Sequence, residues 1–359
     1  MGMSTGFGNT PALDDSVRVE GGVVRILDRR VFPEAVDWVT AHDAEEVAAA
    51  IAAMVTQSSG PLYAAYAGLE ITAGQLTGLA PDAARERMRV AGHALETARP
   101  TNNHPREAVQ RVLAAVDEAA QAPGATTAQL VEAAVDAARS GARLYRERSH
   151  RLATAAVELL PDGARLLTHC WMDSYLIELV RAAREVGKRF DWVATETRPY
   201  LQGARLTAHT LAEFGEHVTL ITDSMGAAAL APGSAIGPID ALVTAADRVA
   251  LDGSVVNKVG TLGLAIAASA FDVPFYALVQ SPDPEAPTAA DIVMEQRDPA
   301  EVLHTLGRRT ASALVTDAWY PAFDVTPPRF VTRIATDRGV FVPERVSDYF
   351  APAVAGASA

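Results

Sequence analysis

The chain has 359 residues, of which 49% are apolar and 21% are charged, and its mean hydropathy is +0.09. This composition is that of a folded globular protein of about two domains, and it excludes a largely disordered chain. The net charge of −13 disfavours a general nucleic-acid binder, because an acidic surface repels phosphate backbones. A single cysteine excludes an intrachain disulfide and any multi-cysteine zinc or iron–sulfur site.

The sequence carries no sign of a membrane span or an export signal. No uncharged apolar run reaches the roughly 18 residues that a spanning helix needs. The amino-terminal run MGMSTGFGNTPALDD has neither the basic nor the apolar region of a signal peptide. We therefore expect a cytoplasmic protein without a membrane partner, in which residues 1–15 are disordered because they are small, polar and turn-rich.

Residues 16–158 are predicted to form a small sheet followed by a helical bundle. The run SVRVEGGVVRILDRRVF reads as short strands around a turn at Gly21-Gly22. Asp43, with Glu46 three residues later, fits a capping box and predicts the start of a helix. Apolar residues then recur at helical spacing in three further Ala-rich stretches, at 82–98, 105–121 and 127–158.

A different pattern begins at residue 159 and continues to residue 348. Short runs rich in Val, Leu, Ile and Thr alternate there with helical segments, and these runs are ARLLTHC, DWVATE, HVTLITD, IDALVTAAD, PFYALVQ and SALVTD. This alternation is typical of a doubly wound α/β domain with a parallel sheet. Residues 349–359 are expected to be a frayed tail.

Reactive and charged side chains gather where the predicted strands end. In an open α/β sheet, ligands bind beyond the carboxyl ends of the strands. The residues at or after the first four strand ends include Cys170, Arg198, Asp223 and Asp247. The run NKVGT, at 257–261, then opens an Ala-rich helix whose N-terminus, with Lys258, would suit an anion. The motifs of dinucleotide-binding, P-loop, zinc-protease and serine-hydrolase sites are absent from the sequence.

Three segments, ETRPYLQGARLTA, DALVTAADRVALDGSVVNKVGT and YPAFDVTP, resemble the methylthioribose-1-phosphate isomerases. Those enzymes share a fold with ribose-1,5-bisphosphate isomerases and with the regulatory subunits of a eukaryotic translation-initiation exchange factor. The resemblance also includes ILDRRVFP, MVTQSSGP, ARPTNNH and LLTHC, so it covers roughly residues 17–345. It implies a small N-terminal sheet and helical domain followed by a Rossmann-like catalytic domain, usually in a homodimer.

The resemblance implies that Cys170 and Asp247 are the catalytic pair and that no metal or cofactor takes part. Converting an aldose 1-phosphate to a ketose 1-phosphate needs a proton on the ring oxygen. Hydrogen must then move from C2 to C1, either as a proton through an enediolate or as a hydride. A carboxylate shielded from water, with its pKa raised, suits the proton transfers. A thiolate facing a helix N-terminus suits abstraction at C2 or electrostatic support.

The resemblance also implies where the substrate binds. Arg99, Gln202, Asn257 and Lys258 match positions that contact the ligand in the family. The loop Ser58-Ser59-Gly60 aligns with a family loop, R-G-A-P, that contacts the substrate phosphate. The substrate is therefore expected to be a small sugar phosphate.

This chain departs from the family pattern at three places. Ser58 stands where the family loop has its arginine, and Trp171-Met172-Asp173 follows the cysteine where Asn and small residues are usual. Asp173 can instead serve as the N-cap of a helix at 174–186. Ser281-Pro282-Asp283 lacks the lysine of the bisphosphate branch, which argues against a second phosphate on the substrate.

Other polar residues near the expected site have plainer interpretations. The side chain of His169 points to the opposite side of an extended strand from Cys170, which favours a structural or supporting role. Asp324, in the YPAFDVTP segment, is expected to hold a turn or a subunit contact. Asp223 fits the lining of a pocket and a helix cap equally well.

Two classes of function stay open. The first is a cofactor-free aldose–ketose isomerase of a 5-modified ribose 1-phosphate, with S-methyl-5-thioribose 1-phosphate as the default substrate and another pentose phosphate as the alternative. The second is a non-catalytic sensor of sugar or nucleotide phosphates, like the exchange-factor subunits. Those subunits do not keep the Cys/Asp pair, so its presence here favours the isomerase.

Overall fold

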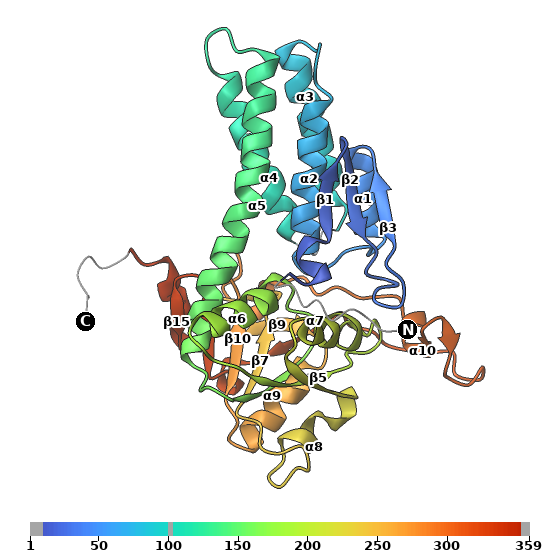
Figure 1. Ribbon diagram of the computed structural model, residues 1–359, viewed down its shortest axis with the longest axis vertical. Helices are drawn as coiled ribbons and strands as arrows, with labels where there is room; N and C mark the ends of the chain where they lie inside the picture. Colours follow the sequence, from blue (N-terminus) through green and yellow to red (C-terminus); the bar gives the residue numbers. More distant parts are fainter. Residues whose placement is uncertain (1–9, 100–102, 353–359) are drawn as a thin grey trace. The chain divides into compact units, whose positions relative to one another are not determined.

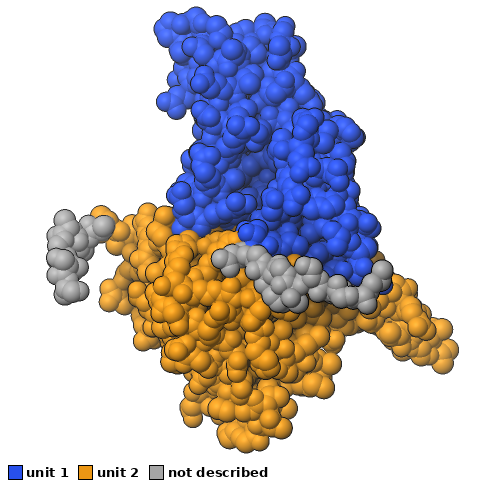
Figure 2. All heavy atoms as spheres, in the orientation of Figure 1, with its two compact units in different colours: residues 1–147 blue, residues 148–359 orange. Residues whose placement is uncertain are grey.

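The computed structural model describes residues 10–99 and 103–352. It divides into two compact units, Met1–Glu147 and Arg148–Ala359, which are coloured separately in Figure 2. The division lies within the long helix α5 (Thr127–Glu158), whereas the sequence pattern changes only after that helix ends. Within the described residues, no helix combines the length and apolarity that crossing a bilayer requires.

The first unit contains a three-stranded antiparallel sheet (Figure 1). Strands β1 (Val17–Glu20) and β2 (Val23–Leu27) form the predicted hairpin, and both glycines of its turn have positive φ. Strand β3 (Trp38–Ala41) pairs with the other edge of β2. The expected disorder is wrong for part of the amino-terminal segment, because Ala12–Asp15 forms a single helical turn that buries Leu13. Residues 1–9 lie outside the described part of the chain.

Helix α1 (Ala44–Ala52) begins where the sequence predicted it. The Asp43 carboxylate accepts a hydrogen bond of 2.8 Å from the amide of Glu46, as an N-cap should. The Glu46 carboxylate reaches back to the amide of His42, one residue before the position of a standard capping box. The predicted helices at 82–98 and 105–121 are confirmed as α3 (Pro81–Thr97) and α4 (Asn103–Ala120).

Helix α2 (Gly60–Gly74) has no counterpart among the predicted elements. Twelve of its fifteen residues are buried, including small, aromatic and aliphatic side chains on every side. A helix that is buried all round has no polar face, so its sequence lacks the helical period that reveals an amphipathic helix. The carboxyl-terminal part of MVTQSSGP forms its start.

The second unit is built on a seven-stranded sheet in the order β15-β14-β10-β7-β4-β5-β6. All neighbouring strands are parallel except β14 and β15. The strands are β4 (Arg165–Thr168), β5 (Asp191–Thr195), β6 (His217–Ile221), β7 (Ala241–Ala245), β10 (Phe275–Leu278), β14 (Arg333–Thr336) and β15 (Gly339–Phe341). The α/β class with a largely parallel sheet is therefore confirmed.

One of the six predicted strands is wrong. The run SALVTD at 312–317 forms no strand, and its Leu314 is 92% exposed. Strands of a parallel sheet are buried on both faces, so β-forming composition alone does not make a strand where no sheet covers the segment. The sixth parallel strand is β14, which lies further along the chain.

The connections between the strands include α6 (Ser174–Glu185), α7 (Ala208–Glu213), α8 (Gly226–Leu230) and α9 (Thr261–Ala270). A second, antiparallel sheet of β8 (Arg248–Val249), β9 (Val255–Lys258) and β13 (Phe323–Thr326) leads into α9. A short hairpin of β11 (His304–Thr305) and β12 (Arg308–Arg309) follows α10 (Ala300–Leu303).

The direction of travel along the main sheet reverses between β4 and β7. Strands β4, β5 and β6 follow one another toward one edge, whereas β7, β10 and β14 follow one another toward the other. The chain segments that leave β4 and β7 therefore diverge, and in open α/β sheets such a reversal point, at the carboxyl ends of the strands, is where ligands bind. This reversal decides where a ligand can bind in the second unit.

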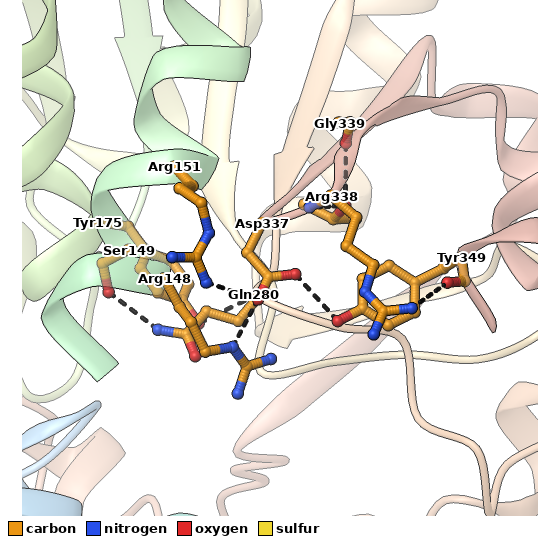
Figure 3. A network of polar contacts seen from close by, with 10 residues as sticks. Arg148, Ser149, Arg151, Tyr175, Gln280, Asp337, Arg338, Gly339 and Tyr349 are labelled. Atoms are coloured by element: carbon orange, nitrogen blue, oxygen red, sulfur yellow. Dashed lines mark hydrogen bonds and ion pairs between the residues drawn. The ribbon is translucent and has the colours of Figure 1, made fainter. Parts of the chain in front are cut away.

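A buried carboxylate, Asp337, ties three segments of the second unit together after β14 (Figure 3). It accepts hydrogen bonds from Arg148 Nε at 2.5 Å and from the Tyr349 hydroxyl at 2.9 Å. The guanidinium of Arg338 lies over the Tyr349 ring, 4.6 Å from its centroid. Asp337 thus links α5 to the carboxyl-terminal helical segment Pro343–Phe350.

We expect Asp337→Asn to lower the free energy of unfolding by about 3 kcal/mol, because it removes the negative charge that pairs with the Arg148 guanidinium in a largely buried place. The side chain of Asp337 is only 6% exposed. The matched control is Asp348→Asn, whose partner Arg345 is exposed, and it should cost less than about 1 kcal/mol. Urea denaturation measures both. Equal losses for the two variants would contradict the structural role of Asp337.

Candidate active site

Cys170 lies two residues beyond the end of β4, at the reversal point of the sheet. Its backbone is left-handed, with φ of +70°, a conformation that costs a non-glycine residue about 1–2 kcal/mol. The surrounding structure must therefore hold it in place. Its amide donates to Thr197 Oγ1 at 2.9 Å, and its carbonyl accepts from the Thr207 hydroxyl. Its Sγ accepts from Gln202 Nε2 at 3.3 Å.

The thiol of Cys170 is protonated at neutral pH. Burial raises its pKa to about 11, the nearby positive charge of Lys258 lowers the pKa, and the negative charge of Asp247 raises it. Burial therefore outweighs the cation and disfavours the thiolate considered in the sequence analysis. The two electrostatic effects also place the charges of Lys258 and Asp247 within range of the sulfur atom.

Asp247 occupies the equivalent place on the neighbouring strand, two residues beyond the end of β7. The sequence thus brings one thiol and one carboxylate to the same crevice from two adjacent parallel strands. The expected shielding from water is not found, because the structure has the Asp247 side chain exposed. The neighbouring Arg248 forms an ion pair with Asp283, the last residue of the Ser281-Pro282-Asp283 segment.

Lys258 and Asn257 end strand β9 and are both buried, as substrate-binding residues at the base of a site would be. The Lys258 ammonium lies 4.6 Å from the centroid of the Phe323 ring, in a cation–π contact. The Asn257 side-chain amide donates to Thr261 Oγ1 at 2.9 Å. The next helix, α9, begins at Thr261, so Lys258 lies just before a helix N-terminus.

The N-terminus of α9 is already occupied by a side chain, so the anion site expected there from the sequence is not available to a phosphate. The carboxylate of Asp324 on β13 accepts hydrogen bonds from the amides of Gly260 at 2.7 Å and Leu262 at 3.1 Å. Burial raises the pKa of Asp324 to about 6, while these two amides and the charge of Lys258 lower it. Asp324 therefore holds the turn, as predicted, and fills the place proposed for the anion.

Gln202 lies beside the thiol and is 1% exposed. Its amide nitrogen donates to the Cys170 sulfur, while its amide oxygen is buried and has no hydrogen-bond partner among the described residues. A buried acceptor without a donor costs free energy unless a bound molecule satisfies it. This oxygen is therefore a place where a substrate hydroxyl group can donate.

Asp223 holds the loop that follows β5. Its two carboxylate oxygens accept from the amides of Thr197 at 2.8 Å and Arg198 at 2.7 Å. Thr197 also has a positive φ of 60°, so this part of the ETRPYLQGARLTA segment is strained and firmly held. The Arg198 guanidinium donates to the carbonyls of Val302 and His304, which makes its role structural.

The predicted cap at Asp173 is only half right. Asp173 occupies the N-cap position of α6, but its side chain accepts no hydrogen bond from the first turn of that helix. Its φ of +49° differs from the extended conformation of a usual N-cap residue, so the carboxylate is not presented to the helix amides. Trp171 is buried, as a space-filling side chain would be.

The remaining predicted substrate contacts, Ser58-Ser59-Gly60 and Arg99, belong to the first unit. The Ser58 carbonyl accepts from His104 Nδ1 at 2.9 Å, and Gly60 is the first residue of α2. A side chain at Gly60 would collide with Thr56 Oγ1, 1.9 Å from its Cβ. Arg99 lies just beyond the end of α3.

Sequence reasoning missed one charged residue beside this loop. Arg29, in ILDRRVFP, is buried, and its guanidinium donates to the carbonyl of Gln57 at 2.8 Å and to Ser16 Oγ at 2.8 Å. A Cβ at Gly60 would lie 3.1 Å from the same guanidinium. A positive charge is therefore next to the loop even though Ser58 replaces the family's arginine. The sequence feature that could have identified Arg29 is the presence of a basic residue within a strand-and-turn segment that is otherwise mostly apolar.

The described residues include no group of three His, Cys, Asp or Glu side chains arranged to hold a metal ion.

Comparison with known proteins gives consistent matches over nearly the whole chain. The model of the Initiation factor 2 subunit family matches residues 60–343. The methylthioribose-1-phosphate isomerase of Desulforudis audaxviator is 37% identical over 332 residues, covering 90% of this chain and 92% of that protein. The isomerase of the same name from Pelotomaculum thermopropionicum is 36% identical over 343 residues, covering 92% of this chain and 91% of that protein.

Two crystal structures resemble this fold closely. The 5-methylthioribose 1-phosphate isomerase from Pyrococcus horikoshii matches with a TM-score of 0.83 and 30% identity, covering 96% of this chain and 98% of that one. The translation initiation factor eIF-2B subunit delta from A. fulgidus matches with a TM-score of 0.78 and 31% identity, covering 91% and 96%.

Proposed function

Because the chain belongs to the initiation factor 2 subunit family, we propose that it is a methylthioribose-1-phosphate isomerase. The substrate would be S-methyl-5-thioribose 1-phosphate, and the product the corresponding ribulose 1-phosphate. Relatives bearing that name, 36–37% identical over nine-tenths of the chain, support the reaction class. We also propose a homodimer and a cytoplasmic location.

One observation carries the assignment of the reacting groups. Cys170 and Asp247 follow adjacent parallel strands by the same number of residues, at the crevice of the sheet. A proton donor and a proton acceptor on either side of a crevice are what an isomerisation between neighbouring carbons needs. The exchange-factor class of function would need neither group.

We assign the proton transfers to these two side chains. The Cys170 thiol gives its proton to the ring oxygen as the bond between that oxygen and C1 breaks. The Asp247 carboxylate takes the proton of the 2-hydroxyl group as the C2 carbonyl forms. Hydrogen passes from C2 to C1, and protonation is restored when Asp247 returns one proton and Cys170 regains one, through the solvent. No net oxidation or reduction takes place, in agreement with an isomerisation.

The phosphate and the sugar hydroxyl groups have separate partners in this proposal. The Lys258 ammonium is close enough to the thiol to influence its pKa, so it can neutralise a phosphate on C1. The unpartnered amide oxygen of Gln202 accepts a sugar hydroxyl group, and Asn257 supports the end of β9 that carries Lys258. Contacts from Ser58, Ser59, Gly60 and Arg99 stay predictions of the family resemblance.

The first experiment follows the reaction by proton NMR with S-methyl-5-thioribose 1-phosphate. The wild-type protein should form the ketose, and both Cys170→Ala and Asp247→Asn should abolish conversion. The matched control is Asp272→Asn, because Asp272 is exposed and precedes β10, at the amino ends of the parallel strands and so opposite to the ends that carry Cys170 and Asp247. Repeating the reaction in D₂O separates the two routes, since a hydride shift leaves protium at C1 whereas an enediolate takes up deuterium.

The alternative function has a distinct outcome in the same experiment. A sensor protein would bind the sugar phosphate, seen as line broadening of the ligand resonances, without converting it. Turnover that survives in both Cys170→Ala and Asp247→Asn would instead keep the reaction class and reject the assigned pair.

A further inference from the structure

Three buried polar side chains in the second unit take no part in the proposed proton transfers. His169, Thr195 and Thr197 are 2%, 0% and 0% exposed. His169 Nε2 lies 2.9 Å from the carbonyl oxygen of Val259, and His169 Nδ1 lies 2.6 Å from Thr195 Oγ1. Thr195 Oγ1 lies 3.3 Å from Thr197 Oγ1, which accepts from the amide of Cys170. These contacts form one continuous chain, which we call the relay.

The Val259 carbonyl and the neutral ring of His169 together set the direction of every hydrogen bond in the relay. The Val259 carbonyl can only accept, so His169 Nε2 carries the hydrogen. Burial lowers the pKa of His169, which keeps the ring neutral and leaves Nδ1 as an acceptor for the Thr195 hydroxyl. The Thr197 hydroxyl then donates to Thr195 Oγ1, and its oxygen accepts from Cys170. Each hydroxyl group has one donor and one acceptor role.

Two glycines from the quoted family segments pack directly against the relay. A Cβ at Gly203 would lie 2.6 Å from Thr197 Oγ1, and a Cβ at Gly260 would lie 2.9 Å from His169 Nε2. Any larger residue at either position would push a relay side chain out of place. Close packing at both ends leaves the relay a single arrangement.

We propose that His169, Thr195 and Thr197 are positioning residues for the catalytic thiol. At one end, Thr197 holds the left-handed backbone of Cys170, which carries the proton for the ring oxygen. At the other end, His169 holds the carbonyl of Val259, the residue that follows Lys258. The relay therefore fixes the thiol and the ammonium relative to each other across β4, β5 and β9. The kinetic part of this inference rests on the proposed function, and the thiol reactivity described below does not.

The test compares three variants by kinetics and by alkylation of Cys170. Thr197→Val keeps the shape of the side chain and removes the hydroxyl group, whereas Thr197→Ser keeps the hydroxyl group. The matched control is Thr210→Val, because Thr210 is equally buried and its hydroxyl group has no hydrogen-bond partner among the described residues. Cys170 is the single cysteine of the chain, so iodoacetamide reports on this thiol alone.

We expect Thr197→Val to lower kcat by about 10- to 100-fold with less than a threefold change in KM, because it removes the contact to Cys170 and leaves the hydrogen bond from His169 to the Val259 carbonyl, next to Lys258, in place. The same variant should speed alkylation of Cys170 at pH 8 by at least fivefold, because the backbone is released. Thr197→Ser and Thr210→Val should stay within twofold of the wild type in both measurements. A purely structural role would give Thr197→Val and Thr210→Val the same small effects, and that result would overturn the inference.

Two further measurements test the inference if Thr197→Val does not fold or if the wild type shows no turnover. If Thr197→Val does not fold, Thr195→Val breaks the relay one step further from the thiol and should show the same pattern. If the wild type does not convert the sugar phosphate, the proposed function fails, while the alkylation rates still decide whether the relay positions Cys170. Unchanged alkylation in Thr195→Val and in Thr197→Val would reject the relay whatever the substrate.

Discussion

Replacing Cys170 by serine is expected to lower kcat by about a thousandfold while KM changes little. An alcohol is a far weaker acid than a thiol, so serine fills the same space but does not deliver a proton to the ring oxygen. General acid catalysis contributes about 10²–10⁴-fold to a rate, which sets the size of the loss. Steady-state kinetics with the sugar phosphate measures both constants. A loss below tenfold would mean that Cys170 is not the proton donor.

The pH dependence of kcat for the wild-type enzyme is a second test of whether the Cys170 thiol is the proton donor. Burial raises the pKa of the Cys170 thiol to about 11, and the protonated form is the one that donates. The activity that depends on this group is therefore fully present below that pKa and is lost as the pH rises through it. Between pH 7 and pH 9, kcat should show no increase. A reactive thiolate would instead make kcat rise about tenfold per pH unit in this range.

The second large effect is expected from Lys258→Met, which should raise KM for the phosphorylated substrate by about 100-fold. A charge-assisted contact with a phosphate contributes roughly 1.5–3 kcal/mol, and methionine keeps most of the side-chain volume. The positive charge of Lys258 also lowers the pKa of the Cys170 thiol, so its removal should slow alkylation of Cys170 at pH 9.

The chain provides its own control, because it contains two lysines, Lys188 and Lys258. The Lys188 ammonium donates to the carbonyls of Val157 and Leu160 at the end of α5. Lys188→Met should therefore reduce stability and leave KM within twofold of the wild type. An unchanged KM in Lys258→Met would remove this residue from the phosphate site.

The main sheet of the second unit could be predicted because its strands have the pattern that burial on both faces imposes. The runs that became β4, β5, β6, β7 and β10 are short, β-branched and separated by helices, and this pattern depends only on the chain itself. The same reasoning failed for SALVTD, since composition does not say whether a sheet is present to cover a segment. Pattern reading also missed helix α2, because a helix that is buried on all sides has no polar face and therefore no helical period in its sequence.

The positions of several candidate site residues could also be predicted from the sequence, but their chemical state could not. Strand ends and family segments located Cys170, Asp247, Gln202 and Lys258 in the second unit. The protonation state of Cys170 could not be predicted, since it depends on how much water the folded chain excludes from the sulfur atom. The filling of the α9 N-terminus by Asp324 was equally hidden, because β13 lies more than sixty residues further along the chain.

The proton that burial keeps on the Cys170 sulfur atom also affects how fast this residue can be oxidised. Peroxides and electrophilic metabolites attack the deprotonated sulfur, so the fraction of ionised thiol sets the rate of damage. With a pKa near 11, that fraction is about one in ten thousand at pH 7. The proposed acid role of Cys170 and its protection from oxidation would thus have the same cause, the burial that keeps the sulfur atom protonated.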